Sequence, residues 1–215
     1  MRDLTCCRSV DSPCSIDEMS SVGGFTIWLT GLPCAGKSTL AQSLARVLLH
    51  QGERVEVLDG DVIRQHLSLG LGFNREDRDR NIRQIAFVAN LLARNGVVVI
   101  VAAVSPYSAT RAQARATLGS FVEVHVDCPA RECERRDVKG MYKRARAGEI
   151  AHFTGVDDPY EPPDAPEVVL RTDLESIAEC TERVLSALES LGHAAREKSG
   201  SIPIAPVVSI TRAVG

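Results

Sequence analysis

The most informative segment of this sequence is Gly31-Leu32-Pro33-Cys34-Ala35-Gly36-Lys37-Ser38-Thr39. The apolar and β-branched run before it, residues 25–29, predicts a short buried strand. After it, apolar residues recur at helical spacing between Leu40 and Leu48, which predicts a helix. A strand, the pattern G-x-x-x-x-G-K-[ST] and a helix, in this order, together predict a phosphate-binding loop.

The chemistry of this loop follows from its residue types. Its glycines let backbone N–H groups close around phosphate oxygens at a helix N-terminus, where the helix dipole favours negative charge. Lys37 would reach the β- and γ-phosphates of ATP, and the Ser38 hydroxyl would ligate Mg²⁺. We therefore expect the whole stretch from Gly31 to Thr39 to bind ATP. The alternative, a glycine-containing turn beside an unrelated lysine, leaves the flanking strand and helix unexplained.

The composition is that of an ordinary globular protein. Of the 215 residues, 44% are hydrophobic and 25% are charged. The formal net charge of −3 provides no basic field for general binding of nucleic acid, so we expect no such partner. The seven cysteines form no C-x-x-C pair, and their odd number argues against a disulfide framework.

The sequence pattern divides the chain into three parts. Residues 1–22 lack the apolar run of a secretory signal, and we expect them to be a disordered leader. Residues 23–191 carry regular patterns and are expected to form one domain, followed by a tail at 192–215. The longest apolar run, Val97–Val104, is too short to cross a bilayer. We therefore expect a cytoplasmic protein with no membrane partner.

Strand and helix patterns alternate through the domain. Further strands are predicted near residues 55–58, 97–101, 121–126 and 168–170, with helices between them and a final helix marked by Leu174 to Leu188. The stretch rich in Gly, Asp and Pro at 148–166 is interpreted as a loop or lid. This order predicts a P-loop NTPase fold, a three-layer α/β/α arrangement with a central parallel sheet and a lid segment. Ligands should then gather at the carboxyl ends of the strands.

Two aspartates follow the second predicted strand. A carboxylate at Asp59 or Asp61 can position Mg²⁺ or accept the proton of an attacking hydroxyl group. The alternative is an Asp-Gly turn in which Asp61 caps the next helix. Asp61 could do both.

Basic and aromatic residues downstream suit an anionic acceptor. Arg64 and Arg78 come just after strand or loop ends, where a guanidinium could hold a phosphate or sulfate. Phe73 could stack on a base, although a role as a core anchor is the alternative. Lys139 and Arg144 belong to a basic stretch that suits a lid closing over phosphates. The sequence carries no N-K-x-D signal of a GTPase and no L-S-G-G-Q-like signature of a transporter ATPase. The residues alone thus predict an ATP-dependent kinase for a small anionic acceptor.

Several ordered blocks make the chain, from about residue 26 to residue 188, resemble the adenylylsulfate kinase (APS kinase) family. These blocks are residues 31–39, Leu58-Asp59-Gly60-Asp61-Val62-Ile63-Arg64, Leu71-Gly72-Phe73 with Asp77-Arg78, Asn81-Ile82-Arg83, Val104-Ser105-Pro106-Tyr107, Asp137-Val138-Lys139-Gly140-Met141-Tyr142, and Phe153-Thr154-Gly155-Val156-Asp157 with Pro159-Tyr160-Glu161. The resemblance implies transfer of the ATP γ-phosphoryl group to the 3′-hydroxyl of adenosine 5′-phosphosulfate, which gives PAPS and serves sulfate assimilation.

The resemblance also implies roles for single residues. Asp61 resembles the catalytic aspartate, with Lys37 beside it on the phosphates, and Asp59 and Ser38 lie near the metal. The residues that match acceptor contacts are Asp61, Arg64, Phe73, Arg78, Asn81, Ser105, Lys139 and Phe153. Phe73 and Phe153 are expected to sandwich the acceptor adenine, and Arg144 and Thr172 to lie around the ATP adenine.

Ser105 matches a serine that the family assigns as a phosphoserine intermediate. In-line transfer needs no covalent relay, so the alternative is that Ser105 hydrogen-bonds the acceptor. The sequence departs from the family at Pro33-Cys34, which replaces its usual Ser-Gly.

The family suggests a homodimer, and an association with a sulfurylase is a further hypothesis. Two alternative functions stay open at this point. One is a P-loop kinase for another small molecule, and the other is a nucleotide-binding partner of a sulfurylase that has no turnover.

Overall fold

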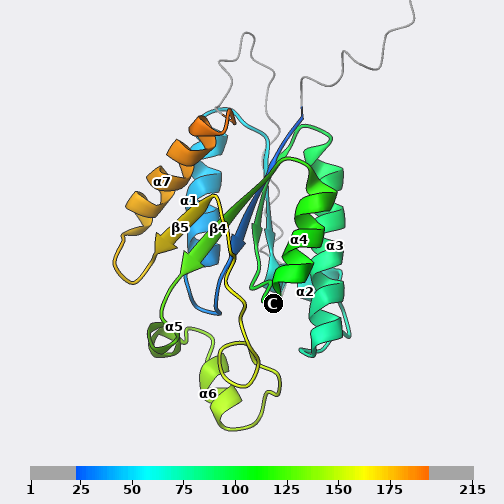
Figure 1. The fold of residues 1–215 in the computed structure, drawn as a ribbon, viewed down its shortest axis with the longest axis vertical. Helices are drawn as coiled ribbons and strands as arrows, with labels where there is room; N and C mark the ends of the chain where they lie inside the picture. Colours follow the sequence, from blue (N-terminus) through cyan, green and yellow to red (C-terminus); the bar gives the residue numbers. More distant parts are fainter. Residues whose placement is uncertain (1–22, 194–215) are drawn as a thin grey trace, which may run out of the picture.

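A computed structural model describes residues 23–193, which form a five-stranded parallel sheet with helices on both faces (Figure 1). The order of the strands in the sheet is β2-β3-β1-β4-β5. Their bounds are β1 Thr26–Thr30, β2 Val55–Asp59, β3 Val98–Ala102, β4 Phe121–Asp127 and β5 Val168–Arg171. The predicted leader, 1–22, and the predicted tail beyond residue 193 lie outside the described residues.

The central strand β1 pairs in parallel with a neighbour on each side. It pairs with β3 on one side, where Thr26 lies opposite Val99, and with β4 on the other, where Thr26 lies opposite Phe121. Every residue of β1 is buried, since helices cover both faces. A parallel pair needs a crossover, and the helices that alternate with the strands in the sequence supply it.

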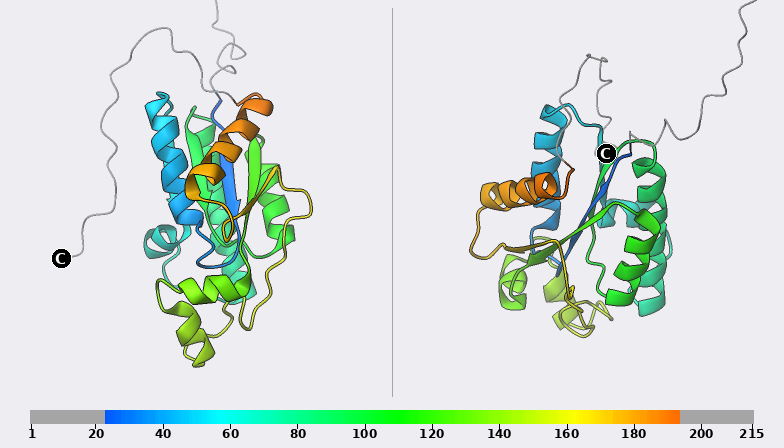
Figure 2. Two further views of the ribbon diagram at one scale, coloured as in Figure 1. Left: turned by 90° about the vertical axis from the view of Figure 1, so that its left-hand side faces the viewer. Right: turned by 45° about the horizontal axis from the view of Figure 1, so that its top comes forward.

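Helices cover both faces of the sheet (Figures 1 and 2). On the first face, α1 (Lys37–His50) packs beside α7 (Ile177–Ser190), with Leu44 and Val184 in a shared core. The second face carries α2 (Gly60–His66), α3 (Arg75–Ala93) and α4 (Ser108–Leu118). There, Ile85 packs in a second core with Trp28. The predicted three-layer α/β/α fold is confirmed.

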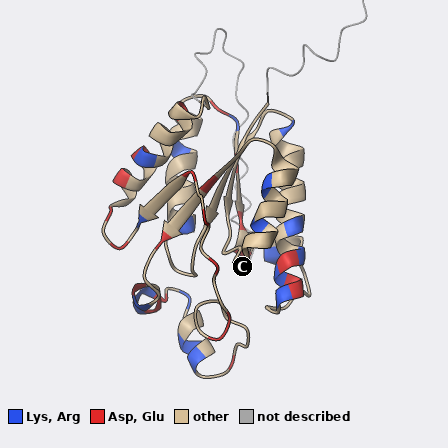
Figure 3. Cartoon of the chain, in the orientation of Figure 1, with Lys and Arg blue, Asp and Glu red and all other residues tan. Residues whose placement is uncertain are grey.

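The lid lies beyond the carboxyl ends of the strands. It contains α5 (Ala130–Arg136), α6 (Met141–Arg146) and the irregular stretch that leads to β5. Lys and Arg residues are prominent on α6 (Figure 3). No helix of residues 23–193 is long and apolar enough to cross a membrane.

The last helix starts later than its pattern predicts. Leu174 is 73% exposed and lies in the turn before α7. Ser176 and Glu179 form a capping box that fixes the start of the helix at Ile177. The prediction that Leu174 belongs to this helix was wrong, because the cap sets the boundary.

Candidate active site

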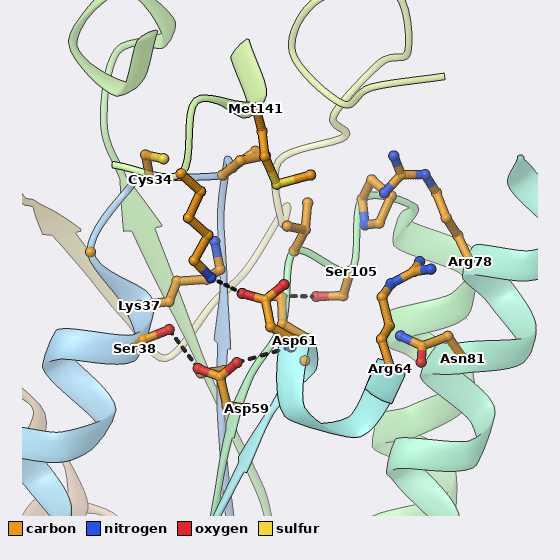
Figure 4. A pocket seen from close by; sticks show the side chains of 18 of the residues that line it. Cys34, Lys37, Ser38, Asp59, Asp61, Arg64, Arg78, Asn81, Ser105 and Met141 are labelled. Atoms are coloured by element: carbon orange, nitrogen blue, oxygen red, sulfur yellow. Dashed lines mark hydrogen bonds and ion pairs between the residues drawn. The ribbon is translucent and has the colours of Figure 1, made fainter. Parts of the chain in front are cut away.

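A cavity of about 440 Å³ opens at the carboxyl ends of β1, β2 and β3 (Figure 4). Its walls come from the phosphate loop, α2, α3, the segment after β3 and the lid. The residues predicted from the sequence that line it are Pro33, Cys34, Gly36, Lys37, Ser38, Thr39, Asp59, Asp61, Arg64, Phe73, Arg78, Asn81, Ser105, Lys139 and Phe153.

The phosphate loop owes its shape to close backbone contacts. A Cβ on Gly31 would lie 2.4 Å from the carbonyl oxygen of Val126, so only glycine fits there. Gly36 has a φ of 100° and leads into α1 without a side-chain cap. Gly36, Lys37, Ser38 and Thr39 line the cavity, so the N-terminus of α1 lies against it, where a helix end suits an anion. Gly31, Leu32 and Ala35 shape the loop from behind and are not among the residues that line the cavity.

Lys37 extends along the inside of the loop. Its Nζ donates hydrogen bonds to the carbonyl oxygens of Gly31 at 2.9 Å and Leu32 at 2.7 Å. Burial lowers the pKa of Lys37 from 10.5 to about 8, and the nearby carboxylates of Asp61 and Asp59 offset part of this effect. An ammonium has three donors, so one remains for a phosphate oxygen.

Ser38, Asp59 and Asp61 form a chain of polar contacts at the floor of the cavity. The Ser38 hydroxyl donates to Asp59 Oδ2 at 2.6 Å, and Asp59 Oδ1 accepts a hydrogen bond from the backbone N–H of Asp61 at 2.9 Å. Asp59 is thus the N-cap of α2, and the alternative that Asp61 caps this helix was wrong. Because Asp59 satisfies the helix end, the Asp61 carboxylate can face the cavity.

Asp61 lies between the two halves of the cavity (Figure 4). The phosphate-loop residues Lys37 and Ser38 lie on one side of it, and Arg64 and Arg78 lie on the other. The Asp61 carboxylate accepts a hydrogen bond from the ammonium of the lid residue Lys139, and their side chains are 56% and 57% exposed. A reacting hydroxyl bound beside Asp61 would meet the base and the phosphate loop together.

The two arginines hold the far wall of the cavity around Phe73. Arg64 donates to the carbonyl oxygen of Gly72 at 2.9 Å, and its guanidinium lies 4.7 Å from the centre of the Phe73 ring. Arg78 donates through Nε to Phe73 O at 2.7 Å and through Nη2 to the carbonyl oxygen of His152. Burial lowers the pKa of both guanidinium groups. Arginine nevertheless stays protonated in proteins, so this wall carries two partly desolvated cations, which suits an anionic ligand.

Phe153 and Asn81 complete this half of the cavity. Phe153 is buried, and its ring packs edge-on against Tyr142 at 5.0 Å between ring centres. Asn81 is 5% exposed, and its Oδ1 has no hydrogen-bond partner within the described residues. A buried acceptor without a partner is costly, so Asn81 is suited to a ligand that donates a hydrogen bond.

Ser105 is more buried than the sequence suggests. Only 2% of the residue is exposed, and its backbone has a φ of 40°. The hydroxyl accepts a hydrogen bond from Trp28 Nε1 at 3.1 Å and donates one to Thr30 Oγ1 at 2.9 Å. The side chain therefore connects β1 with the segment that follows β3 in the cavity wall.

The two residues expected around the ATP adenine do not line the cavity. Arg144 lies on α6, where Nε donates to Glu149 Oε2 at 3.1 Å. Thr172 lies behind the phosphate loop and donates to the carbonyl oxygen of Ala35 at 2.8 Å. Arg136 reaches the cavity instead, and it donates to Thr172 O at 2.7 Å.

Arg136 belongs to the residues that sequence reasoning did not single out. Its neighbourhood is a run of charges, which gives no signal of a special role. Val138 and Met141 also line the cavity, and Tyr142 donates from its hydroxyl to Pro33 O at 3.2 Å. Val138, Met141 and Tyr142 belong to the block at residues 137–142 that carries the family resemblance, so the sequence did point to their neighbourhood.

Comparisons with known proteins agree with this geometry. The family model described as adenylylsulphate kinase matches residues 23–171. An adenylyl-sulfate kinase of Rippkaea orientalis is 57% identical over 173 residues, which cover 80% of this chain and 96% of that protein.

Two solved structures are similar as well. The APS kinase CysC of Mycobacterium tuberculosis, solved in complex with AMPPNP and APS, is 46% identical with a TM-score of 0.75, and the match covers 78% of this chain and 98% of that one. A hexameric APS kinase from Thiobacillus denitrificans is 37% identical with a TM-score of 0.62, and the match covers 80% of this chain and 30% of that one. This chain therefore belongs to the adenylylsulphate kinase family, and it is an ATP-dependent kinase with a P-loop fold.

Proposed function

We propose that the protein transfers the γ-phosphoryl group of ATP directly to the 3′-hydroxyl of adenosine 5′-phosphosulfate, with Asp61 as the general base. The observation that carries this proposal is the place of the Asp61 carboxylate between the phosphate loop and the two arginines. A base in that place accepts the hydroxyl proton as the oxygen attacks phosphorus.

The ATP half of the site consists of the loop amides, the N-terminus of α1 and Lys37. These groups stabilise the negative charge that develops on the transferred phosphoryl group and the leaving ADP. Arg136 and Thr172 extend this half on the side of the lid. We assign Arg144 and Thr172 to the surroundings of the ATP base, and we add Arg136, which lines the cavity and donates to Thr172 O.

Ser38 and Asp59 are the residues that would hold Mg²⁺. Within residues 23–193, no group of three or more His, Cys, Asp or Glu side chains could hold a metal ion alone. One hydroxyl and one carboxylate 2.6 Å apart fit Mg²⁺, which in nucleotide sites takes its other ligands from phosphates and water. When bound, Mg²⁺ supplies charge neutralisation on the β- and γ-phosphates.

The acceptor half consists of Arg64, Arg78, Asn81, Lys139 and the two phenylalanines. The guanidinium groups and the Lys139 ammonium suit the phosphosulfate, which is a strongly anionic group. Phe73 and Phe153 offer apolar rings for the adenine. The unpartnered Asn81 Oδ1 suits the exocyclic amine or a ribose hydroxyl of the same ligand.

The hydroxyl of Ser105 supports direct transfer over a phosphoserine relay. It is buried, and hydrogen bonds with Trp28 and Thr30 occupy it as acceptor and donor. Phosphorylation at Ser105 would break both bonds and bury a dianion, which is costly without paired cations. We therefore assign Ser105 to the wall beside the acceptor.

The remaining expectations concern the cellular context. We propose a homodimer in the cytoplasm, with sulfurylase as the source of the acceptor. The hexameric relative supports assembly in the family but leaves the size of the assembly open. Light scattering of the purified protein, with and without a sulfurylase, tests both the homodimer and the association.

A coupled assay for PAPS formation tests the function. ATP and adenylylsulfate should give PAPS and ADP in equal amounts, whereas AMP or gluconate as acceptors should release ADP at the background rate. ADP release with gluconate, or tight nucleotide binding without PAPS, would instead support one of the two alternative functions.

A further inference from the structure

The cavity wall formed by residues 104–106 has an unusual backbone. Ser105, at its centre, has a φ of 40°, in the left-handed region that an L-residue adopts only at an energetic cost. Surrounding contacts must therefore hold this segment in place. These contacts come from two sources outside the cavity, the side chain of Arg111 and the strap, which we define as residues 158–161.

Arg111 lies on α4 behind the wall and is 3% exposed. Its guanidinium donates to Ser105 O at 2.7 Å through Nη1 and to Glu161 O at 2.8 Å through Nη2. Its Nε donates to Glu123 Oε1 at 2.9 Å, so a buried carboxylate balances the charge. One side chain thus joins the cavity wall, the strap and strand β4.

The strap contacts the same wall directly. The N–H of Glu161 donates to Pro106 O at 2.8 Å, and its carboxylate accepts hydrogen bonds from the N–H and hydroxyl of Ser108 at 2.7 and 2.8 Å. The hydroxyl of Tyr160 lies 3.1 Å from Thr30 Oγ1, which is also the partner of the Ser105 hydroxyl. The strap continues from the lid loop that carries Phe153.

A lysine cannot reproduce the hydrogen bonds of the Arg111 guanidinium. A guanidinium presents planar donors at fixed angles and can hold two carbonyl groups and a carboxylate at once. A lysine ammonium at this position can keep the charge balance with Glu123 but loses the fixed geometry. Arg111→Lys therefore removes the hydrogen bonds that position the wall without leaving Glu123 as an unpaired buried charge.

We propose that Arg111, together with the strap, is a positioning residue that sets the wall at Ser105 against the acceptor and links it to the lid. This inference rests on the proposed function. Arg111 touches no reacting group and acts through Ser105 and Glu161. The wall lies on the acceptor side of Asp61. Loss of the guanidinium hydrogen bonds should therefore impair use of the acceptor and leave the phosphate loop intact.

Arg115 provides a matched control on the same helix. It donates to Glu123 Oε2 at 3.2 Å and to Glu167 at 2.6 Å, so it shares the Glu123 carboxylate with Arg111. Its partners Glu123 and Glu167 do not line the cavity. The kinetic constants for each substrate and the melting temperature are measured for wild type, Arg111→Lys and Arg115→Lys.

Arg111→Lys should lower kcat/KM for adenylylsulfate by about tenfold or more, since small displacements at a reacting centre are costly in rate. Its KM for ATP should stay within about twofold of wild type, and Arg115→Lys should leave both substrates within about twofold. The inference is overturned if Arg111→Lys only lowers the melting temperature, or if it raises both KM values equally.

A second pair of variants keeps the inference testable if Arg111→Lys does not fold. Tyr160→Phe removes the hydroxyl that contacts Thr30, and Glu161→Gln weakens the contacts with Ser108 while Arg111 stays paired. Both should lower kcat/KM for adenylylsulfate selectively, and wild-type values in both would refute the inference. The wild-type enzyme in the same assay tests the proposed function separately. If the wild type forms no PAPS, the proposed function is refuted, whatever the variants do.

Discussion

Lys139 and Asp61 form an ion pair although they lie 78 positions apart in the sequence. Lys139 belongs to the turn between the lid helices α5 and α6, and Asp61 to the first turn of α2. The contact therefore joins the lid to the proposed base. An anionic acceptor that attracts Lys139 would release the Asp61 carboxylate for proton transfer at the moment when it is needed.

Asp61→Asn should lower kcat by roughly 10²-fold or more, because an amide cannot accept the proton of the 3′-hydroxyl. The isosteric change should leave ATP binding close to wild type, which a direct binding titration checks. Steady-state PAPS formation gives kcat. Turnover close to that of wild type would exclude Asp61 as the base.

Lys139→Met should raise the KM for adenylylsulfate by about tenfold, since a charge-assisted contact with the anionic acceptor is lost. Its stability should stay within about 0.5 kcal/mol of wild type, because ion pairs between exposed side chains contribute little. Lys143→Met, on the neighbouring lid helix, is the control and should keep the wild-type KM. Equal effects of the two changes would indicate general electrostatic attraction by the lid.

The pH dependence of ATP binding should report the protonation of Lys37. Burial lowers the pKa of Lys37 to about 8, so the side chain is charged below that pH and loses its charge above it. The kcat/KM for ATP should therefore fall as the pH rises above about 8, approaching tenfold per pH unit, since this parameter reports ionisation of the free enzyme.

The lowered pKa of Lys37 also predicts how the free energy of unfolding changes with pH. The unfolded chain holds the Lys37 proton up to its ordinary value of 10.5, whereas the folded protein releases it from about 8. The free energy of unfolding should gain a contribution that grows with pH between these values. Urea titrations of wild type and Lys37→Met at several pH values check this, and identical pH profiles would contradict it.

Cys34→Gly should stabilise the protein, by up to about 1.5 kcal/mol. Cys34 has a φ of 62°, which costs an L-residue roughly 1–2 kcal/mol, while glycine costs about 0.5–1 kcal/mol in chain entropy. Urea unfolding measures the difference, with Cys34→Ala as a control that keeps the strain. A glycine variant no more stable than the alanine variant would show that the loop is relaxed at this position.

The fold follows from patterns that are local in the sequence. Alternating apolar runs and helical periods are enough to predict a parallel three-layer sheet, and the glycine pattern with Lys37 and Ser38 is enough to predict the phosphate loop. The order of the later blocks indicated the acceptor. Helix boundaries were less predictable, since the capping box at Ser176 decided the start of α7 and not the apolar Leu174.

The contacts within the site could not be predicted in this way. Asp59 rather than Asp61 caps α2, because the Asp59 carboxylate reaches the Asp61 N–H. Arg136 lines the cavity although its sequence neighbourhood gives no signal, whereas the Arg144 side chain donates to Glu149. Both contacts depend on the conformation of a side chain in the folded protein, which the local sequence pattern does not specify.

The class of fold, the phosphate loop and the family can be inferred from the amino-acid sequence, because neighbouring residues and their spacing carry that information. The burial of Ser105 and its backbone hydrogen bond with Arg111 are visible only in the folded protein. The Ser105 hydroxyl meets Trp28 across 77 positions, and Arg111 meets Glu161 across 50. Such partners come together when the sheet and its covering helices have packed, so no local pattern records them.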